Sequence, residues 1–156
     1  MKESSFAPNL FGCVGRNPGL ARTLNRLRAE SFAILGDCLL FAVCFEEEPQ
    51  DGALFEELAT REIEDFSLLA RLIRVLGGEE APRLQVRLGG IPFGYREPTI
   101  PDARRAIEAV EERNRKLCSA LERIILHCDD AVVRATLAYL LERRQIQPEE
   151  IKKRLH

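Results

Sequence analysis

The segment 62-EIEDFSLLARLIRVLGG-78 decides the fold class, because its apolar residues recur every three or four positions. With the residues before it, the apolar stripe comprises Phe55, Leu58, Phe66, Leu69, Ile73 and Leu76. Such a stripe is typical of an amphipathic α-helix, and Gly77-Gly78 supplies a left-handed stop. We therefore predict a helix over residues 52–76. Two acids, Glu62 and Asp65, interrupt its apolar face.

A second long helix is predicted upstream. Asn17 has a side chain suited to a helix N-cap, and Pro18 suits the first helical position. The residues that follow carry a stripe at spacings of three and four, which comprises Thr23, Leu27, Glu30, Ile34, Cys38, Phe41 and Phe45. This pattern predicts a helix over residues 18–46, which the polar run 46–52 brings to an end.

The second half of the chain predicts another pair of helices. One starts at Pro101-Asp102 and carries an apolar stripe as far as Cys128. Asp129-Asp130 turns the chain and caps the next helix. Pro148 has no N–H for the helical ladder, so we expect it to break or kink that helix. Residues 148–154 are then predicted to form a separate short C-terminal helix.

The two helical pairs are joined by a long connection. Residues 79–100 contain several prolines and no helical period, although Leu84–Leu88 alternates and could form a short strand. So long a connection is expected to span the length of the molecule. Two hairpins joined by one crossover predict an all-α four-helix bundle with ferritin-like connectivity, in a single domain over residues 1–156.

Charge and cysteine content exclude several classes of protein. Lys and Arg number 23 against 25 Asp and Glu, for a net charge of −2, so the basic excess of a nucleic-acid-binding protein is missing. No apolar run approaches the roughly 20 residues that cross a bilayer. The chain has an odd number of cysteines, five, and no Cys-x-x-Cys motif. We also find no export signal in the sequence. We therefore expect reduced thiols and a cytoplasmic protein with neither nucleic acid nor membrane as partner.

Three passages resemble the ferritin-like superfamily, and within it the rubrerythrin and manganese-catalase-like branch. These passages are residues 27–35, 62–78 and 111–141. The resemblance implies a bundle in which two helices each supply a Glu, and the other two each supply a Glu-x-x-His, to a di-iron or di-manganese centre. Glu30 and Glu62 match two of these glutamates, whereas Asp65 stands where the family has His.

The resemblance continues in the second hairpin, but the residues there are not of the types that bind the metals in the family. Aligning the turn and the apolar stripes places Asn114 at the third helix's Glu position, and Arg144 and Gln147 at the last Glu-x-x-His. Other registers would use Glu111, or Glu142 with Gln145. The resemblance therefore implies a degenerate di-metal site.

Arg144 is the sharpest departure, because a guanidinium is a permanent cation without a lone pair for a metal. We therefore hypothesise that Arg144 occupies the vacated centre and pairs with Glu30, Glu62 or Asp65, leaving no cofactor. The alternative is that Arg144 extends from the end of its helix into solvent. A metal centre would need several anionic oxygens and imidazole nitrogens, of which few remain.

Two functions follow from these alternatives. The first is a non-catalytic structural or interaction protein, which we expect to form a homodimer. Self-association is indicated by an apolar arc that is wider than the stripe a helix needs to pack into one bundle. The arc is formed by Leu39, Leu40, Phe41, Ala42, Val43 and Phe45. The second is a metal-binding oxidoreductase or a peroxide- or iron-handling protein. It would hold iron or manganese at Glu30, Glu62 and Asp65, with Glu111 as a further candidate.

Overall fold

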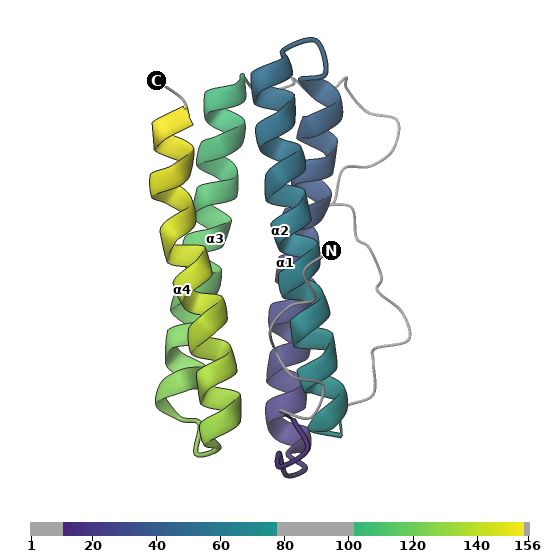
Figure 1. Ribbon diagram of the computed structural model, residues 1–156, viewed down its shortest axis with the longest axis vertical. Coiled ribbons are helices and arrows are strands. Elements are labelled where there is room, and N and C mark those ends of the chain that lie inside the picture. The colour runs from purple at the N-terminus through teal and green to yellow at the C-terminus, as the bar shows by residue number, and fades with distance from the viewer. Residues whose placement is uncertain (1–10, 78–101, 155–156) are drawn as a thin grey trace, which may run out of the picture.

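The computed structural model describes residues 11–77 and 102–154, and these residues form four α-helices (Figure 1). The helices are α1 (Pro18–Cys44), α2 (Pro49–Val75), α3 (Ala103–Leu126) and α4 (Ala131–Arg154). No strand occurs within the described ranges. The prediction of an all-α helical bundle is therefore confirmed.

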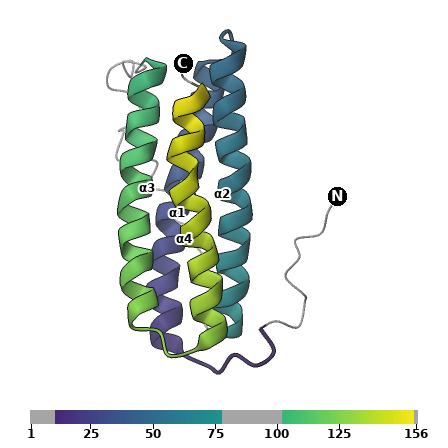
Figure 2. The same cartoon turned by 60° about the vertical axis from the view of Figure 1, so that its left-hand side comes forward.

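The helices form a bundle in which each neighbour runs antiparallel. α1 lies beside α2 and α3, and α4 lies beside the same two helices. Both views show α1 and α4 pointing one way along the bundle and α2 and α3 the other (Figures 1 and 2). The C-terminal end of α2 and the N-terminal end of α3 thus lie at opposite ends of the bundle. The predicted crossover over 79–100, with its short strand, lies outside the described residues.

The helix ends follow the signals seen in the sequence. Asn17, Asp102 and Asp130 cap α1, α3 and α4, each accepting a hydrogen bond from a first-turn backbone N–H at 3.1, 2.8 and 2.9 Å. Each cap satisfies a donor that the helix itself leaves unpaired. Gly77 follows the end of α2 with a φ of 81°, the left-handed conformation that glycine adopts without strain.

The start of α2 differs from the prediction. The helix begins at Pro49 rather than residue 52, because proline suits a first turn, where its missing N–H is not needed. Gly52 therefore lies inside the helix. A Cβ there would come within 3.1 Å of the Phe45 carbonyl oxygen, so glycine permits the close turn between α1 and α2.

One hydrophobic core joins the four helices. Its most deeply buried large apolar side chains are Leu24, Ile34, Phe55, Leu58, Leu72, Ile73, Leu76, Ile107, Leu121, Leu137 and Leu140. Burying a side chain of this kind stabilises a fold by about 1.5–3 kcal/mol. Apolar packing thus accounts for association of the helices, and the polar residues in the same interior require a separate explanation.

Pro148 does not break α4, so the predicted separate helix over 148–154 is wrong. Because proline lacks an N–H, the Arg144 carbonyl four residues earlier loses its helical donor. The Asn114 side chain replaces that donor, since its Nδ2 donates to the Arg144 carbonyl oxygen at 3.0 Å. Ile151, which is buried in the core, holds the following turn on the bundle. A single α4 therefore continues through the proline.

This account predicts that Asn114 and Pro148 are energetically coupled. Asn114→Ala should lower the free energy of unfolding by roughly 2 kcal/mol or more, because it leaves buried polar groups unpaired. In a Pro148→Ala background the loss should be smaller by about 1 kcal/mol, since residue 148 then supplies the N–H. Urea unfolding of the wild type, both single variants and the double variant measures the coupling. Strictly additive losses would contradict it.

Candidate functional site

A layer of polar residues crosses the interior of the bundle. The buried polar or charged residues on the four helices are Arg28, Ser31, Glu62, Asp65, Asn114, Thr136, Arg144 and Gln147. Arg144 is only 2% exposed, which makes it one of the largest fully buried side chains. Charged groups are almost never buried to this degree unless they are paired. The partners of Arg144 therefore define the site.

The Arg144 guanidinium reaches residues of the three other helices. Its Nη1 and Nη2 donate to Glu62 Oε1 at 2.8 Å and Oε2 at 2.7 Å. Nη1 also donates to Asn114 Oδ1 at 3.0 Å, and Nη2 to Ser31 Oγ at 3.3 Å. Nε lies 3.4 Å from Asp65 Oδ2. We call these five residues the arginine centre.

Two further contacts complete the geometry of the arginine centre. Ser31 Oγ donates to Glu62 Oε2 at 2.8 Å, so both oxygens of that carboxylate have donors. Asn114 accepts from the guanidinium with its oxygen and donates to the Arg144 carbonyl with its nitrogen. A bidentate arginine–carboxylate pair is among the strongest hydrogen-bonded arrangements in proteins. The centre therefore links α1, α2, α3 and α4.

The charge of Arg144 is retained despite its burial. Burial alone lowers the pKa of this guanidinium, but Glu62 and then Asp65 act against it and leave the pKa above its ordinary value. The centre thus contains one permanent cation and two carboxyl groups. Removing one member of a buried ion pair costs far more than its net contribution, because the other charge is left uncompensated.

Asp65 is the less satisfied of the two carboxyl groups. Its Oδ1 is buried without a hydrogen-bond donor, and the nearest recorded cation is Arg143 Nε at 3.6 Å. Burial raises the pKa of Asp65 from 3.8 to about 6, although Arg144 and Arg143 act to lower it. Asp65 is therefore the group of the centre that exchanges a proton near neutral pH.

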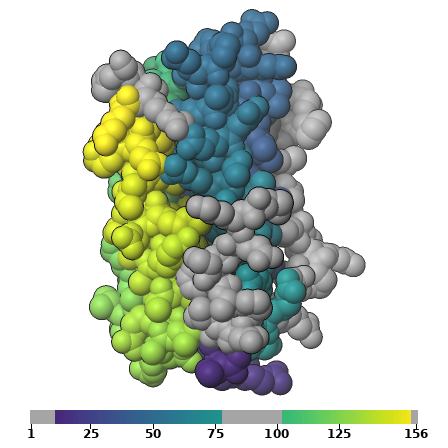
Figure 3. Space-filling view, in the orientation of Figure 1, coloured from purple at the N-terminus to yellow at the C-terminus, as the bar shows by residue number. Residues whose placement is uncertain are grey.

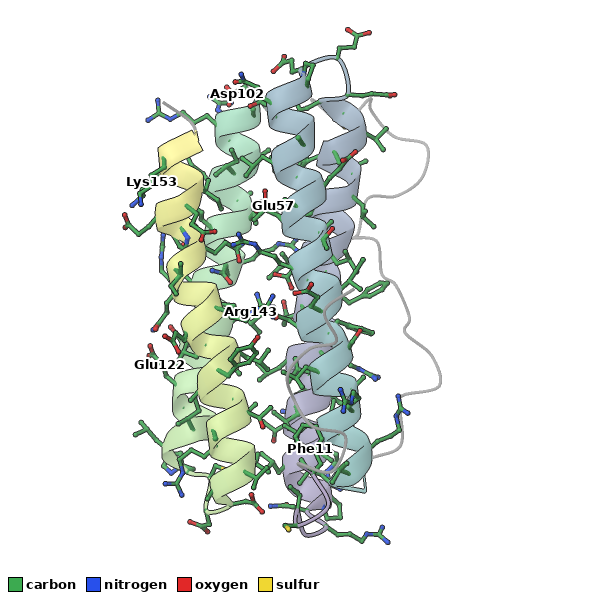
Figure 4. The ribbon with its side chains drawn as sticks, in the orientation of Figure 1. Phe11, Glu57, Asp102, Glu122, Arg143 and Lys153 are labelled. Carbon is green, nitrogen blue, oxygen red and sulfur yellow. The ribbon has the colours of Figure 1, made fainter. Side chains whose placement is uncertain are left out.

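Arg143 closes the edge of the centre between α4 and α2. Figure 4 shows it at about mid-height between these two helices, and its Nη2 donates to Glu64 Oε2 at 2.6 Å. Asp65, Arg143 and Gln147 line a shallow cleft here, together with Arg61 and Glu150. In the space-filling view, side chains of α2 and α4 meet along the upper part of this face (Figure 3). The arginine centre is thus screened from bulk water.

Of the sites suggested by the sequence, Glu62, Asp65, Asn114 and Arg144 come together as predicted. The pairing of Arg144 with Glu62 and Asp65 is confirmed, and the alternative in which Arg144 extends into solvent is wrong. Gln147 is buried and lines the same cleft as Asp65.

The placement of Glu30 in the interior is wrong. Its side chain is exposed, and the neighbouring Ser31 takes the inward position. Residues 27–45 are apolar on nearly every side, so the periodicity of α1 admits more than one inward stripe. The spacing Leu24, Leu27, Ser31, Ile34 and Cys38 was the missed signal, since all five are buried.

The residues that the alternative registers of the second hairpin would use are not fully buried. Glu142 and Gln145 are exposed. Glu111 is half-buried and lines a cleft between α3 and α4, which Asn114 and Arg144 also line but Glu62 and Asp65 do not. Within the described residues, neither register adds a third carboxylate to Glu62 and Asp65 in a group that could hold a metal ion.

Cys38 has the most deeply buried thiol of the described cysteines. Cys38 is buried, and burial, followed by the charge of Glu62, raises the pKa of its thiol to about 12. Cys13, Cys44, Cys118 and Cys128 are also free thiols.

The residues of the centre do not fit a di-metal group. Within the described ranges, no three or more His, Cys, Asp or Glu side chains gather closely enough to hold a metal ion. Both oxygens of Glu62 already accept hydrogen bonds, and Arg144 offers no lone pair. A cation also stands where the metal charge would be, so it would repel the metal.

Comparisons with known protein families, with curated proteins and with solved structures find no match to this chain. Among the described helices, none is both long enough and apolar enough to cross a membrane.

Truncating the guanidinium should strongly destabilise the bundle. We expect Arg144→Met to lower the free energy of unfolding by about 3–5 kcal/mol, because Glu62 is left buried and unpaired. Arg144→Met combined with Glu62→Leu should recover part of that loss. Urea unfolding followed by circular dichroism measures both. A loss below about 1 kcal/mol for the single variant would be typical of a surface pair and would contradict the buried pairing.

Asp65 should make stability depend on pH. Its pKa is higher in the folded protein, so the proton-linked stabilisation is full below about pH 4 and is lost as the pH rises through about 6. Relative to Asp65→Asn, the wild type should therefore lose roughly 2–3 kcal/mol between about pH 4 and about pH 7. Urea unfolding of both proteins across this range tests it, with Glu142→Gln as the exposed control. A difference that does not change with pH would refute the assignment.

Proposed function

We propose that this protein is a non-catalytic structural or interaction protein, built as a ferritin-like bundle in which an arginine has replaced the di-iron or di-manganese centre. The observation that carries the proposal is the bidentate contact of the Arg144 guanidinium with both Glu62 oxygens at 2.8 and 2.7 Å. A carboxylate committed in this way is not free to bridge two metal ions.

The course of the helices supports a relation to the rubrerythrin and manganese-catalase-like branch. α2 ends at one end of the bundle and α3 begins at the other, as in bundles whose second and third helices are joined by a long crossover. The polar positions Glu62, Asp65, Asn114 and Arg144, which the family register selected, meet in one layer. Their convergence in the interior supports the proposal that the layer is a degenerate form of the family's metal site.

We further propose that the protein resides in the cytoplasm and acts through its surface as a homodimer. Free thiols and the near balance of charges are consistent with this placement. Because an ion pair fills the interior, a partner would be bound by the outer faces of the helices.

A second candidate function is that of a metal-binding oxidoreductase or a peroxide- or iron-handling protein. The observation in its favour is the buried Asp65 Oδ1, which has no hydrogen-bond donor and could meet a cation. Arg143 Nε lies 3.6 Å from this oxygen, however, and Arg144 Nε 3.4 Å from the other oxygen of the same carboxylate, so both charges oppose a metal there.

Metal analysis of protein purified without chelators separates the two candidates. We expect far less than one iron or manganese per chain, because the arginine cation occupies the centre. Stoichiometric metal, retained through gel filtration, would refute the non-catalytic proposal and favour the alternative.

A charge reversal gives the reciprocal test. Arg144→Glu places a third carboxylate beside Glu62 and Asp65, so Co²⁺ should stabilise this variant against heat or restore its helical signal. Arg143→Glu makes the same change of charge at the edge of the centre and should respond less. Co²⁺ stabilisation of the wild type equal to that of Arg144→Glu would show that the guanidinium does not exclude metals.

A further inference from the structure

α1 has an apolar face on the side that points away from the bundle. We call it the outer α1 face, and it is formed by Ala29, Ala33, Gly36, Leu40 and Val43. These residues recur every three or four positions, on the opposite side of the helix from the buried Ser31 and Cys38. Leu40 is 54% exposed and Val43 is 70% exposed. A contiguous apolar patch usually marks a contact, so the question is what covers this one.

The chain leaves α2 and returns to α3 beside the two ends of α1. At one end, the Asn17 N–H donates to the Leu76 carbonyl oxygen at 3.0 Å, so α2 ends beside the first turn of α1. Further along α1, Asp37 Oδ2 pairs with Arg113 of the antiparallel α3 at 3.3 Å. Because α3 begins at Ala103, about 15 Å before Arg113, its start lies beside the C-terminal end of α1. The connection between α2 and α3 therefore has to run the length of α1.

Two routes would take the connection along the bundle. α1 and α4 each pack against both α2 and α3, so a chain from the end of α2 to the start of α3 passes over α1 or over α4 (Figures 1 and 2). Residues 78–101 are long enough for either route, because an extended chain of this length reaches roughly 80 Å, about twice the length of α2. The surfaces of the two helices therefore decide between the routes.

The outer side of α4 is unsuited to an apolar chain. Its exposed residues there include Arg134, Glu142, Glu149 and Lys152, which lie on the opposite side of the helix from the buried Leu140. Covering these charges would cost free energy unless each were paired. Covering the outer α1 face removes only apolar surface from water, which stabilises the fold. Burial therefore favours the route over α1.

The connection carries the apolar residues that such a surface would bind. They are Leu84, Val86, Leu88, Ile91 and Phe93. The first three alternate with Gln85 and Arg87, and in an extended chain alternate side chains point to opposite sides. Gly36 leaves room for the backbone of such a chain, since a Cβ built there would meet nothing within 4 Å. The pattern of the connection thus matches an apolar surface on one side and water on the other.

We propose that the outer α1 face is covered by the connection of the same chain, residues 78–101, whose apolar residues between 84 and 93 pack along it. The proposal does not rest on the proposed function, because it concerns a surface on the far side of α1 from the arginine centre. It leaves the proposed homodimer to other faces of the bundle.

Maleimide modification of Val43→Cys in the full chain measures whether the face is covered, with peptide mass spectrometry as the readout. We expect Val43→Cys to react at least about tenfold more slowly than in the same chain with serine at all five apolar positions of the connection. The slower rate should not change on dilution, because the covering segment belongs to the same molecule. Ile63→Cys is the control, since Ile63 is 50% exposed on α2 and should react equally in both backgrounds.

A crosslink separates the two routes. Leu40→Cys combined with Ile91→Cys should give an intramolecular crosslink with a short bis-maleimide, located by peptide mapping of the monomer. Ala138→Cys, at an exposed position on the outer side of α4, is the matched control and should not crosslink to Ile91→Cys. This measurement uses no serine substitution, so it tests the proposal even where the serine variant fails to fold.

Equal modification rates of Val43→Cys with and without the serine substitutions would overturn the proposal. Protection that is lost on dilution would also overturn it and would assign the face to a second copy of the chain. A crosslink of Ile91→Cys to Ala138→Cys as efficient as that to Leu40→Cys would place the connection over α4 instead. Metal analysis of the same samples reports separately on the proposed function, so either proposal can fail while the other stands.

Discussion

The bidentate contact between Arg144 and Glu62 is the constraint on which the interior depends. Each group alone would be a buried charge of high free energy, and together they tolerate removal from water. Apolar stripes alone leave two helices free to shift by about one turn, or about 5.4 Å, with little loss of burial. The guanidinium has one position that satisfies its partners, so it sets the height of α4 against the other helices.

Asn114 extends this constraint from side chains to the backbone. Its oxygen and nitrogen serve the guanidinium and the carbonyl of the same residue, so the orientation of its amide is determined by both. The second bond exists because Pro148 leaves that carbonyl without a helical donor. A residue that ordinarily disrupts a helix thus becomes part of the attachment between α3 and α4.

Most of the fold was predictable because its signals are local. Caps at Asn17, Asp102 and Asp130 and the stop at Gly77 depend on neighbouring backbone groups, and all four behave as their residue types require. Pro148 was misjudged because its donor replacement comes from a residue far away in the sequence. Glu30 was misjudged because α1 is apolar on two sides, and only packing decides which side faces inward.

By itself the sequence determined four helices, most of their ends and the presence of an arginine among apolar residues, because these properties follow from periodicity and from chemistry within a few residues. Only the tertiary structure decided that Ser31 rather than Glu30 completes the centre, that Asp65 is left with an oxygen lacking a donor, and that α4 continues through Pro148. Each of these outcomes depends on distances between different helices. Such distances are set by the packing of the whole bundle.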